Sequence, residues 1–356
     1  MLRWCHFISV SDLHSAFSKA TVQTLQATDY LSVNEKYNAY ILSNKGNRFL
    51  SRNFDHIPPP TKRTYRETNV FRRIDSSRFM LCAYRAGLSV FTTELSEIEG
   101  EGTFYLTALS RVSGSNPWGS SRIMAVVHLG DIICGVYPIS AGDAKMSLND
   151  EMTALNNNTA RFRCKRRGII FTGNSFESIH SALNTPTRKT GKTKYISYGD
   201  VFDRISLPTF VLPWNETGAL QLHMMLHADY RTRMTMAALG SHWVPPPKEY
   251  TEWDAIYDDM PLIMAADMNL KRIDEALHTA QTSECSKVCL AALRGQTDIL
   301  RKRYKSDGLV KKVVTFSTEK EEVRNELALH TPPDQLFVTE KGAVIHAPPI
   351  KIAGKA

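Results

Sequence analysis

The residues of this 356-residue chain with the most reactive side chains are its cysteines and histidines. A cysteine thiolate can attack an electron-poor carbon, and a histidine can move the protons that such a reaction requires. The six cysteines are scattered along the chain instead of forming a compact disulfide pattern, which favours free thiols in a reducing compartment. They are Cys5, Cys82, Cys134, Cys164, Cys285 and Cys289.

Metal binding is a second chemistry to consider. His223 and His227 have the outer spacing of a zinc-protease helix, but no glutamate follows His223, and the segment is typical of a strand. Cys285 and Cys289 would share one face of a helix, yet no further cysteine or histidine stands at ligand spacing. We therefore expect no metal ion and no cofactor.

Anion binding is the third chemistry. The chain has 44 basic and 36 acidic residues and a formal charge of +8, which suits a partner such as RNA. Three basic clusters could contact phosphates, and Phe162 and Tyr304 within them could stack on unpaired bases. The alternative is that each cluster is an ordinary solvated surface. The cations are Arg161, Arg163, Lys165, Arg166 and Arg167; Arg188, Lys189, Lys192 and Lys194; and Arg301, Lys302, Arg303 and Lys305.

The elements that position these residues can be predicted from periodicity and from turn signals. Strands are expected at 40–42, 79–84, 88–92, 103–109, 123–128, 132–137, 168–171, 220–226, 234–239, 262–265, 312–316, 335–338 and 343–346. Helices are expected at 147–156, 175–183, 270–281, 285–304 and 319–328. This order predicts a mixed α/β fold with one domain over residues 27–350 and a short tail at 351–356.

Residues 1–26 can be drawn as an amphipathic helix with one acidic residue, Asp12. Such a segment is more typical of a mitochondrial presequence than of a secretory signal, whose apolar region is unbroken. The alternative is an ordinary N-terminal helix. We expect the protein in the mitochondrial matrix, and no apolar run approaches the roughly 20 residues that a membrane span needs.

A Phe171-Thr172-Gly173 turn stands before a predicted helix, the segments 124–128 and 131–135 precede it as paired strands, and the segments 220–226 and 234–239 follow as a second pair. In this order of segments, residues from about 120 to 347 resemble the dimethylarginine dimethylaminohydrolase family. The resemblance implies the pentein fold, which is a five-bladed α/β-propeller. It also implies that His223 stands where the family has its general acid/base histidine.

The same resemblance predicts that the chain is not an enzyme. The family attacks a guanidinium carbon with a cysteine thiolate, and carboxylates hold the cationic substrate. Residues 327–334, where that cysteine is expected, contain no thiol, and residues 161–167 are basic where the family has acids. His223 is then vestigial.

A chain of this family that lacks the catalytic residues and has a mitochondrial-like leader resembles the catalytically inactive core subunit of the kinetoplastid RNA editing substrate-binding complex. The resemblance implies a scaffold that holds guide RNA and mRNA through protein partners or through direct phosphate contacts, away from any membrane. Two alternatives stay open. One is a structural protein of a mitochondrial ribosome, and the other is an active guanidino-group hydrolase that uses a displaced cysteine.

Overall fold

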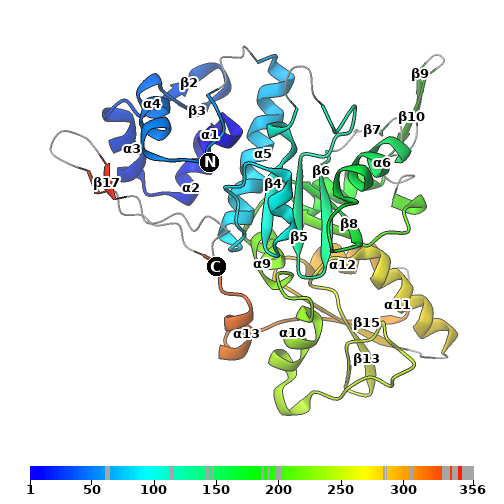
Figure 1. Cartoon of the computed structure of the whole chain (residues 1–356). Helices are drawn as coiled ribbons and strands as arrows, with labels where there is room; N and C mark the ends of the chain where they lie inside the picture. The colour runs from blue at the N-terminus through cyan, green and yellow to red at the C-terminus, as the bar shows by residue number, and fades with distance from the viewer. Residues whose placement is uncertain are drawn as a thin grey trace.

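The centre of the molecule is a five-stranded sheet with helices on both faces (Figure 1). Its strand order is β11-β8-β6-β5-β4, with antiparallel pairing from β4 to β6 and parallel pairing from β6 to β11. The strands are β4 Thr103–Leu106, β5 Ala125–Leu129, β6 Ile132–Pro138, β8 Arg166–Gly173 and β11 Thr209–Pro213. The computed structural model describes residues 1–60, 65–111, 116–140, 144–145, 148–185, 188–190, 193–197, 202–283, 285, 287–304, 308–330, 337–338 and 344–346.

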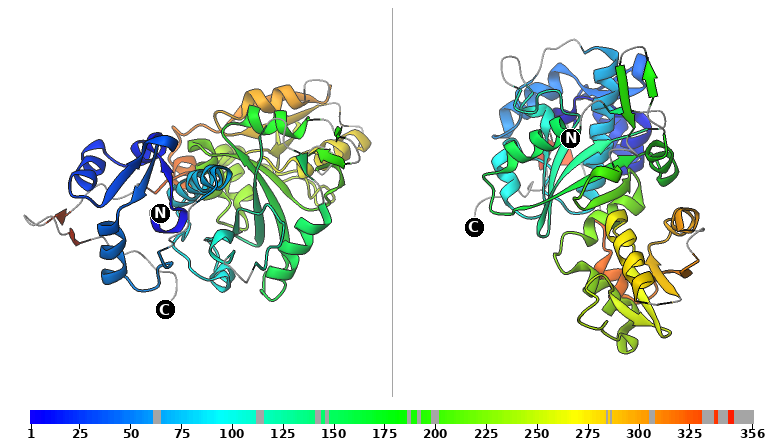
Figure 2. Two further views of the ribbon diagram at one scale, coloured as in Figure 1. Left: turned by 90° about the horizontal axis from the view of Figure 1, so that it is seen from above. Right: turned by 90° about the vertical axis from the view of Figure 1, so that its right-hand side faces the viewer.

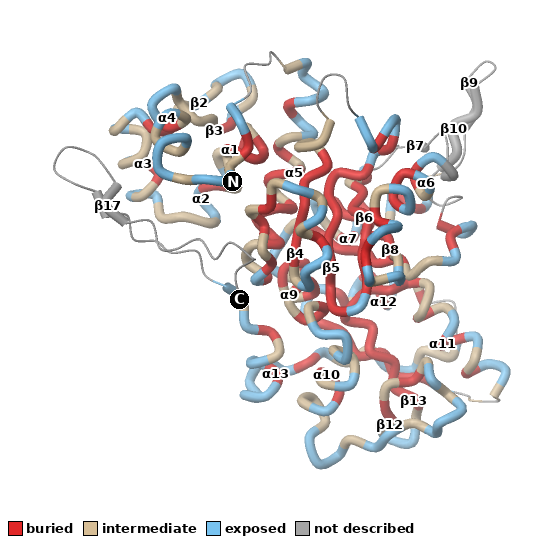
Figure 3. Tube along the Cα trace, in the orientation of Figure 1, coloured by how far each residue is buried: buried red, intermediate tan, exposed pale blue. Residues whose placement is uncertain are grey.

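Two pairs of helices cover this sheet. Helices α6 Leu148–Thr159 and α7 Phe176–Leu183 pack on the face that carries Ile133, Ile169 and Val211. Helices α5 Glu67–Arg85 and α9 Glu216–Met224 pack on the opposite face. Because both faces are buried, most strand residues are apolar instead of alternating with polar ones, and the charged exceptions are Arg166 and Arg167 at the start of β8. Figure 3 shows that burial is concentrated there.

A second sheet, of four strands, has the order β12-β13-β14-β15. Its strands are β12 Ala255–Tyr257, β13 Met260–Met264, β14 Val288–Ala292 and β15 Val310–Thr315. Helices α11 Leu270–Thr282 and α12 Thr297–Tyr304 belong to the core on one face. Helices α10 Tyr230–Leu239 and α13 Glu321–Glu326 contribute Met234 and Val323 to the core on the other.

The two sheets repeat one order of elements. Each contains an antiparallel hairpin, a helix, a parallel strand, a second helix and a second parallel strand. In the first sheet the order is β5-β6-α6-β8-α7-β11, and in the second it is β12-β13-α11-β14-α12-β15. Helices α6 and α7 of the first sheet and helices α11 and α12 of the second contribute to one shared hydrophobic core.

An N-terminal layer packs against α5, at the end of the molecule away from the second sheet (Figures 1 and 2). Its antiparallel sheet has the order β1-β3-β2, and the side chain of Trp4 is buried in the main core, where its indole N–H donates to the carbonyl of Thr92 at 2.7 Å. Residues 1–26 therefore form several short elements, not the one helix expected. The layer contains α1 Leu2–Cys5, β1 Ile8–Ser9, α2 Val10–Ala16, α3 Lys19–Ala27, β2 Leu31–Asn34, β3 Ala39–Leu42 and α4 Asn44–Asn53.

Two small sheets complete the described strands. Strands β7 Ala144–Lys145, β10 Thr193–Ser197 and β9 Arg188–Thr190 form one, and β16 Phe337–Val338 pairs with β17 Val344–His346 in the other. The mixed α/β class is thus confirmed. Neither of the two larger sheets closes on itself in the described residues, and the five-bladed propeller stays a prediction.

Several predicted elements were wrong. Residues 79–84 and 234–239, expected as strands, lie in α5 and α10, and residues 220–224 of the strand expected at 220–226 lie in α9. A short apolar run does not by itself distinguish a strand from a buried helix, and the Asn215 side chain caps α9 by accepting from the N–H of Gly218. The helix expected at 285–304 is instead β14 followed by α12, with Gly295 at a φ of +95° between them. Of residues 88–92, only Ser89 forms an isolated β-bridge, with Thr103.

Candidate nucleic-acid interface

The first basic cluster, residues 161–167, connects α6 to β8, and two of its cations support the fold. The Lys165 ammonium donates to the carbonyls of Ala160 and Phe162 at 3.0 and 2.8 Å. The Arg167 guanidinium donates to the hydroxyl and carbonyl of Thr159 and to the carbonyl of Cys164. Thr159 is the last residue of α6, so Arg167 binds the end of that helix, whereas Lys165 binds carbonyls of the turn that follows it.

The other cations of this cluster face solvent to different degrees. Arg166 forms an ion pair with Asp131. Arg163 is 95% exposed, and its Nε lies 3.5 Å from Glu99, an exposed pair that contributes little energy. Arg161 is exposed, with its guanidinium 5.5 Å from the ring of Phe162. Arg161 and Arg163 are therefore the cations of this cluster with the freest access to an anionic ligand.

The two aromatic residues expected to stack on bases are buried. Phe162 is 1% exposed and lies in the core beneath the cluster. Tyr304 is 7% exposed, and its hydroxyl donates to Asp274 at 2.8 Å. The prediction that these two rings stack on bases is wrong. Alternation of basic and aromatic residues in a sequence does not reveal which side chains point inward.

The second cluster lies on the hairpin of β9 and β10. Lys189 and Lys194 are directly paired in its register, and Arg188 pairs with Tyr195. The hairpin therefore places two of the predicted cations at one cross-strand position. Lys192 lies outside the described residues.

The third cluster is the last turn of α12. Arg301 and Lys302 are exposed, whereas Arg303 pairs with Asp274 at 3.0 Å and lies over the ring of Phe202. Arg303 thus holds α12 to α11, and only its two neighbours are open to solvent. Lys305 lies outside the described residues.

His223 lies near the end of α9, not on a strand. Its Nδ1 is 3.0 Å from the carbonyl of Ala86, with which it forms a hydrogen bond. In the described parts of the chain, no hydrogen bond or ion pair links its imidazole to a thiol or a carboxylate. The imidazole is placed to fasten α9 to the end of α5.

The thiols are poor nucleophiles where they are buried. Burial raises the pKa of Cys5 and of Cys82 to about 12 and that of Cys289 to about 11, and it raises the pKa of Cys134 as well. Neighbouring arginines, such as Arg85 near Cys82, offset only part of this effect. Cys164 and Cys285 are half-buried. The buried thiols stay protonated at neutral pH.

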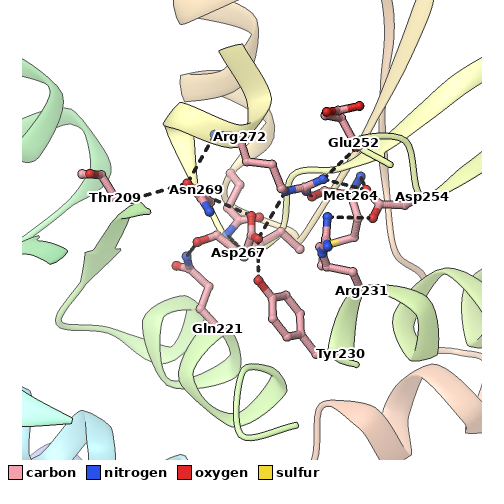
Figure 4. Close-up of polar contacts among 12 residues, drawn as sticks. Thr209, Gln221, Tyr230, Arg231, Glu252, Asp254, Met264, Asp267, Asn269 and Arg272 are labelled. Atoms are coloured by element: carbon pink, nitrogen blue, oxygen red, sulfur yellow. Dashed lines mark hydrogen bonds and ion pairs between the residues drawn. The ribbon is translucent and has the colours of Figure 1, made fainter. Parts of the chain in front are cut away.

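A buried polar network joins the two larger sheets, and no sequence motif indicated it (Figure 4). Arg272 lies 3.0 Å from Asp254 and 3.8 Å from Asp267, which is fully buried and accepts a hydrogen bond from the Tyr230 hydroxyl at 2.7 Å. Burial opposes the charge of Arg272, but the two carboxylates outweigh it and raise the pKa of the guanidinium. Arg231 lies 3.4 Å from Asp254, so the network contains two arginines and two aspartates.

The loop that carries Asp267 also covers the outer edge of β11. The N–H of Val211 donates to the carbonyl of Met268 at 3.1 Å, and Phe210 forms an isolated bridge with Asn269. The Gln221 amide donates to the carbonyls of Val211 and Asp267. These contacts identify the network as a structural junction, because its charges are paired and enclosed.

A hollow beside β11 and α12 is lined mainly by apolar side chains, together with His180 and Arg303. No group of three or more histidine, cysteine or acidic side chains is arranged to hold a metal ion in the described ranges. None of the described helices combines the length and the apolar character of a membrane span.

Of the three basic clusters, the described cations that face solvent without a close ion pair or a carbonyl acceptor are Arg161, Arg301 and Lys302, and Arg163 has only its exposed pair with Glu99. Comparisons with protein-family models, with curated proteins and with solved structures found no match.

Proposed function

We propose that the chain is a non-catalytic, RNA-contacting subunit of a mitochondrial RNA-processing assembly such as an RNA editing substrate-binding complex. The observation that carries the proposal is the set of solvent-facing cations with no close carboxylate partner. Among the described residues, Arg161, Arg301 and Lys302 form no ion pair, and Arg163 has only its weak pair with Glu99. Such cations are free to neutralise phosphates.

The thiols and His223 support the non-catalytic part of the proposal. A thiolate attack needs a lowered cysteine pKa and a base within hydrogen-bond reach. Burial has the opposite effect on four of the cysteines, and His223 is bonded to a backbone carbonyl.

The kinship with dimethylarginine dimethylaminohydrolases, and with it the five-bladed propeller, is a separate proposal. It was based in part on strands at 220–226 and 234–239, which are helices α9 and α10. The direct RNA contact and the mitochondrial location do not rest on that kinship, whereas the choice of an editing complex does. The RNA contact rests on the exposed cations, and the location rests on the presequence-like composition of residues 1–26.

Purification of the tagged, full-length protein from mitochondria tests the assignment. We expect RNA-processing factors and RNA to co-purify at moderate salt, and the RNA to be lost at high salt because phosphate contacts weaken. Recovery of ribosomal proteins instead would assign the chain to the mitochondrial ribosome, and a cytosolic location would contradict the proposal.

The RNA contact itself is tested with the double variant Arg161→Gln/Arg163→Gln. Loss of two phosphate contacts reduces the slope of log affinity against log salt by about 1.4 for single-stranded RNA. Lys19→Gln, at an exposed cation on α3, is the matched control. An unchanged slope in the double variant would show that these two arginines are ordinary surface residues.

Citrulline release by the purified protein tests the non-catalytic assignment. We expect no turnover of guanidino compounds. Turnover that a thiol alkylator abolishes would establish the hydrolase alternative.

A further inference from the structure

The most exposed aromatic residue described is Phe71, near the start of α5. Its side chain is 52% exposed, although α5 packs its other face into the core. The ring of Tyr37, from the 3-10 helix Glu35–Tyr37, lies edge-to-face against it, with centroids 6.1 Å apart and an interplanar angle of 85°. Two segments distant in sequence thus bring aromatic rings together at the surface.

These rings are held from beneath by the core. Phe7, which is 7% exposed, packs against Tyr37 at 6.3 Å and against Tyr65 at 5.6 Å. Tyr65 in turn lies 5.6 Å from the ring of His6. Because the row of rings is anchored at its buried end, its exposed end is already ordered, and little side-chain entropy remains to be lost when a flat ligand stacks on it.

Cations lie along this row of rings. The Lys36 ammonium lies 5.0 Å from the Tyr37 centroid next to Phe71, and the Arg73 guanidinium lies 5.8 Å from the Tyr65 centroid, toward the buried end. Arg66, the N-cap residue of α5, and Arg72, the neighbour of Phe71 in sequence, are exposed. Glu35 and Glu67 are exposed on the same elements, so the cations outnumber the acids. The surface therefore favours a ligand that is anionic and that carries flat apolar rings.

We propose that this surface, the Phe71 platform, binds single-stranded RNA, with bases stacked on Phe71 and Tyr37 and phosphates near Lys36, Arg66 and Arg72. Unpaired bases present their faces to aromatic side chains, whereas bases within a duplex stack on one another. A protein partner fits less well, because one exposed phenylalanine among charges falls short of an apolar docking patch. The inference rests on the RNA contact of the proposed function. It adds where on the surface RNA binds and that the bound RNA is single-stranded.

The experiment measures binding of fluorescently labelled oligouridine and oligoadenosine to the full-length protein. Phe71→Ala is expected to weaken binding roughly five- to hundredfold, the range that loss of one stacked base gives. Phe71→Tyr retains the ring and is expected to retain binding. Met236→Ala, at another exposed apolar residue on α10, is the matched control and is expected to change nothing. Circular dichroism verifies that each variant is folded.

Two further measurements complete the test. A duplex of the same sequence is expected to be insensitive to Phe71→Ala, because its bases are not free to stack. Arg72→Gln is expected to reduce the salt slope by about 0.7, the value for one phosphate contact with a single strand.

The outcomes separate the two proposals. Single-strand binding that Phe71→Ala leaves intact, but that Arg161→Gln/Arg163→Gln weakens, overturns the platform and leaves the proposed function in place. Absence of any RNA binding by the unaltered protein overturns both the platform and the direct RNA contact.

Discussion

The guanidinium of Arg167 donates hydrogen bonds to both the hydroxyl and the backbone carbonyl of Thr159, at 2.7 and 2.6 Å. Thr159 is the last residue of α6 and is fully buried. A residue that the sequence marks as a phosphate-binding cation therefore closes the end of a helix. Its charge is engaged within the fold before any ligand arrives.

Arg167 is consequently expected to affect stability more than binding. Arg167→Met keeps the aliphatic stem but removes the charged donor to Thr159 and Cys164, and loss of hydrogen bonds from a charged group costs about 1.5–3 kcal/mol in the free energy of unfolding. Arg163→Met, at the 95% exposed neighbour, is the control and is expected to stay within about 0.5 kcal/mol. Urea denaturation measures both, and equal stabilities would contradict the capping role of Arg167.

The Arg272 junction is expected to be one of the most sensitive sites in the molecule. Arg272→Met leaves Asp254 and Asp267 buried without their shared cation, and breaking a buried ion pair from one side costs about 3–5 kcal/mol. Arg233→Met is the matched control, because the pair of Arg233 with Glu326 is partly exposed and contributes at most about 1 kcal/mol. Denaturant unfolding of the two variants compares them, and a loss of under 1 kcal/mol for Arg272→Met would contradict the junction.

The cysteines are expected to divide into two groups when the folded protein is alkylated. Cys164 and Cys285 are half-buried and should react, whereas Cys5, Cys82, Cys134 and Cys289 are buried. Burial also raises the pKa values of those four thiols and so removes the reactive thiolate. Mass spectrometry after a short pulse of iodoacetamide at pH 7.5 identifies the modified residues. Rapid modification of Cys82 would contradict this assignment. It would support the alternative of a hydrolase with a displaced cysteine, because Cys82 lies near the start of α9.

His6 is expected to make the protein less stable in mild acid. Burial, together with Arg73 and Arg3, lowers the pKa of His6 to about 4. Above its unfolded pKa of about 6.5 the imidazole is neutral in both states. As the pH falls from there toward 4, the unfolded chain binds a proton that the folded chain resists, so the free energy of unfolding decreases.

The His6→Asn variant isolates this contribution. His6 has a φ of 68°, a left-handed conformation that asparagine also tolerates. The variant is expected to lose less stability than the parent protein between pH 7 and pH 4.5, as measured by urea denaturation at each pH. Parallel pH profiles for the two proteins would show that His6 does not contribute.

The sequence allowed the central strands to be predicted better than several of the helices. Strands β5, β6 and β8 are rich in β-branched residues. Helix α7 follows the N-cap residue Ser175, whose hydroxyl accepts from the N–H of Ser178. Helices α9 and α10 were mistaken for strands because each segment is short and apolar. Their helical state depends on packing against α5 and on the core around Met234, which a local pattern does not contain.

The site was predictable in composition but not in geometry. The basic clusters are evident from the sequence, yet burial of Phe162 and the pairing of Arg303 with Asp274 depend on contacts across the fold. The same holds for the Phe71 platform, since Tyr37 and Phe71 come from separate segments. Asp254 and Tyr230 are likewise joined only by tertiary structure, through Arg272 and Asp267.

The cover over β11 has a consequence for misfolding. That strand, with the sequence TFVLP, ends the five-stranded sheet, and the loop that follows β13 occupies its free side. If the four-stranded unit detached, an apolar strand with unpaired amide groups would become a template for strand addition by another copy. The contacts that tie the loop around Asp267 to β11 therefore also guard the protein against self-association.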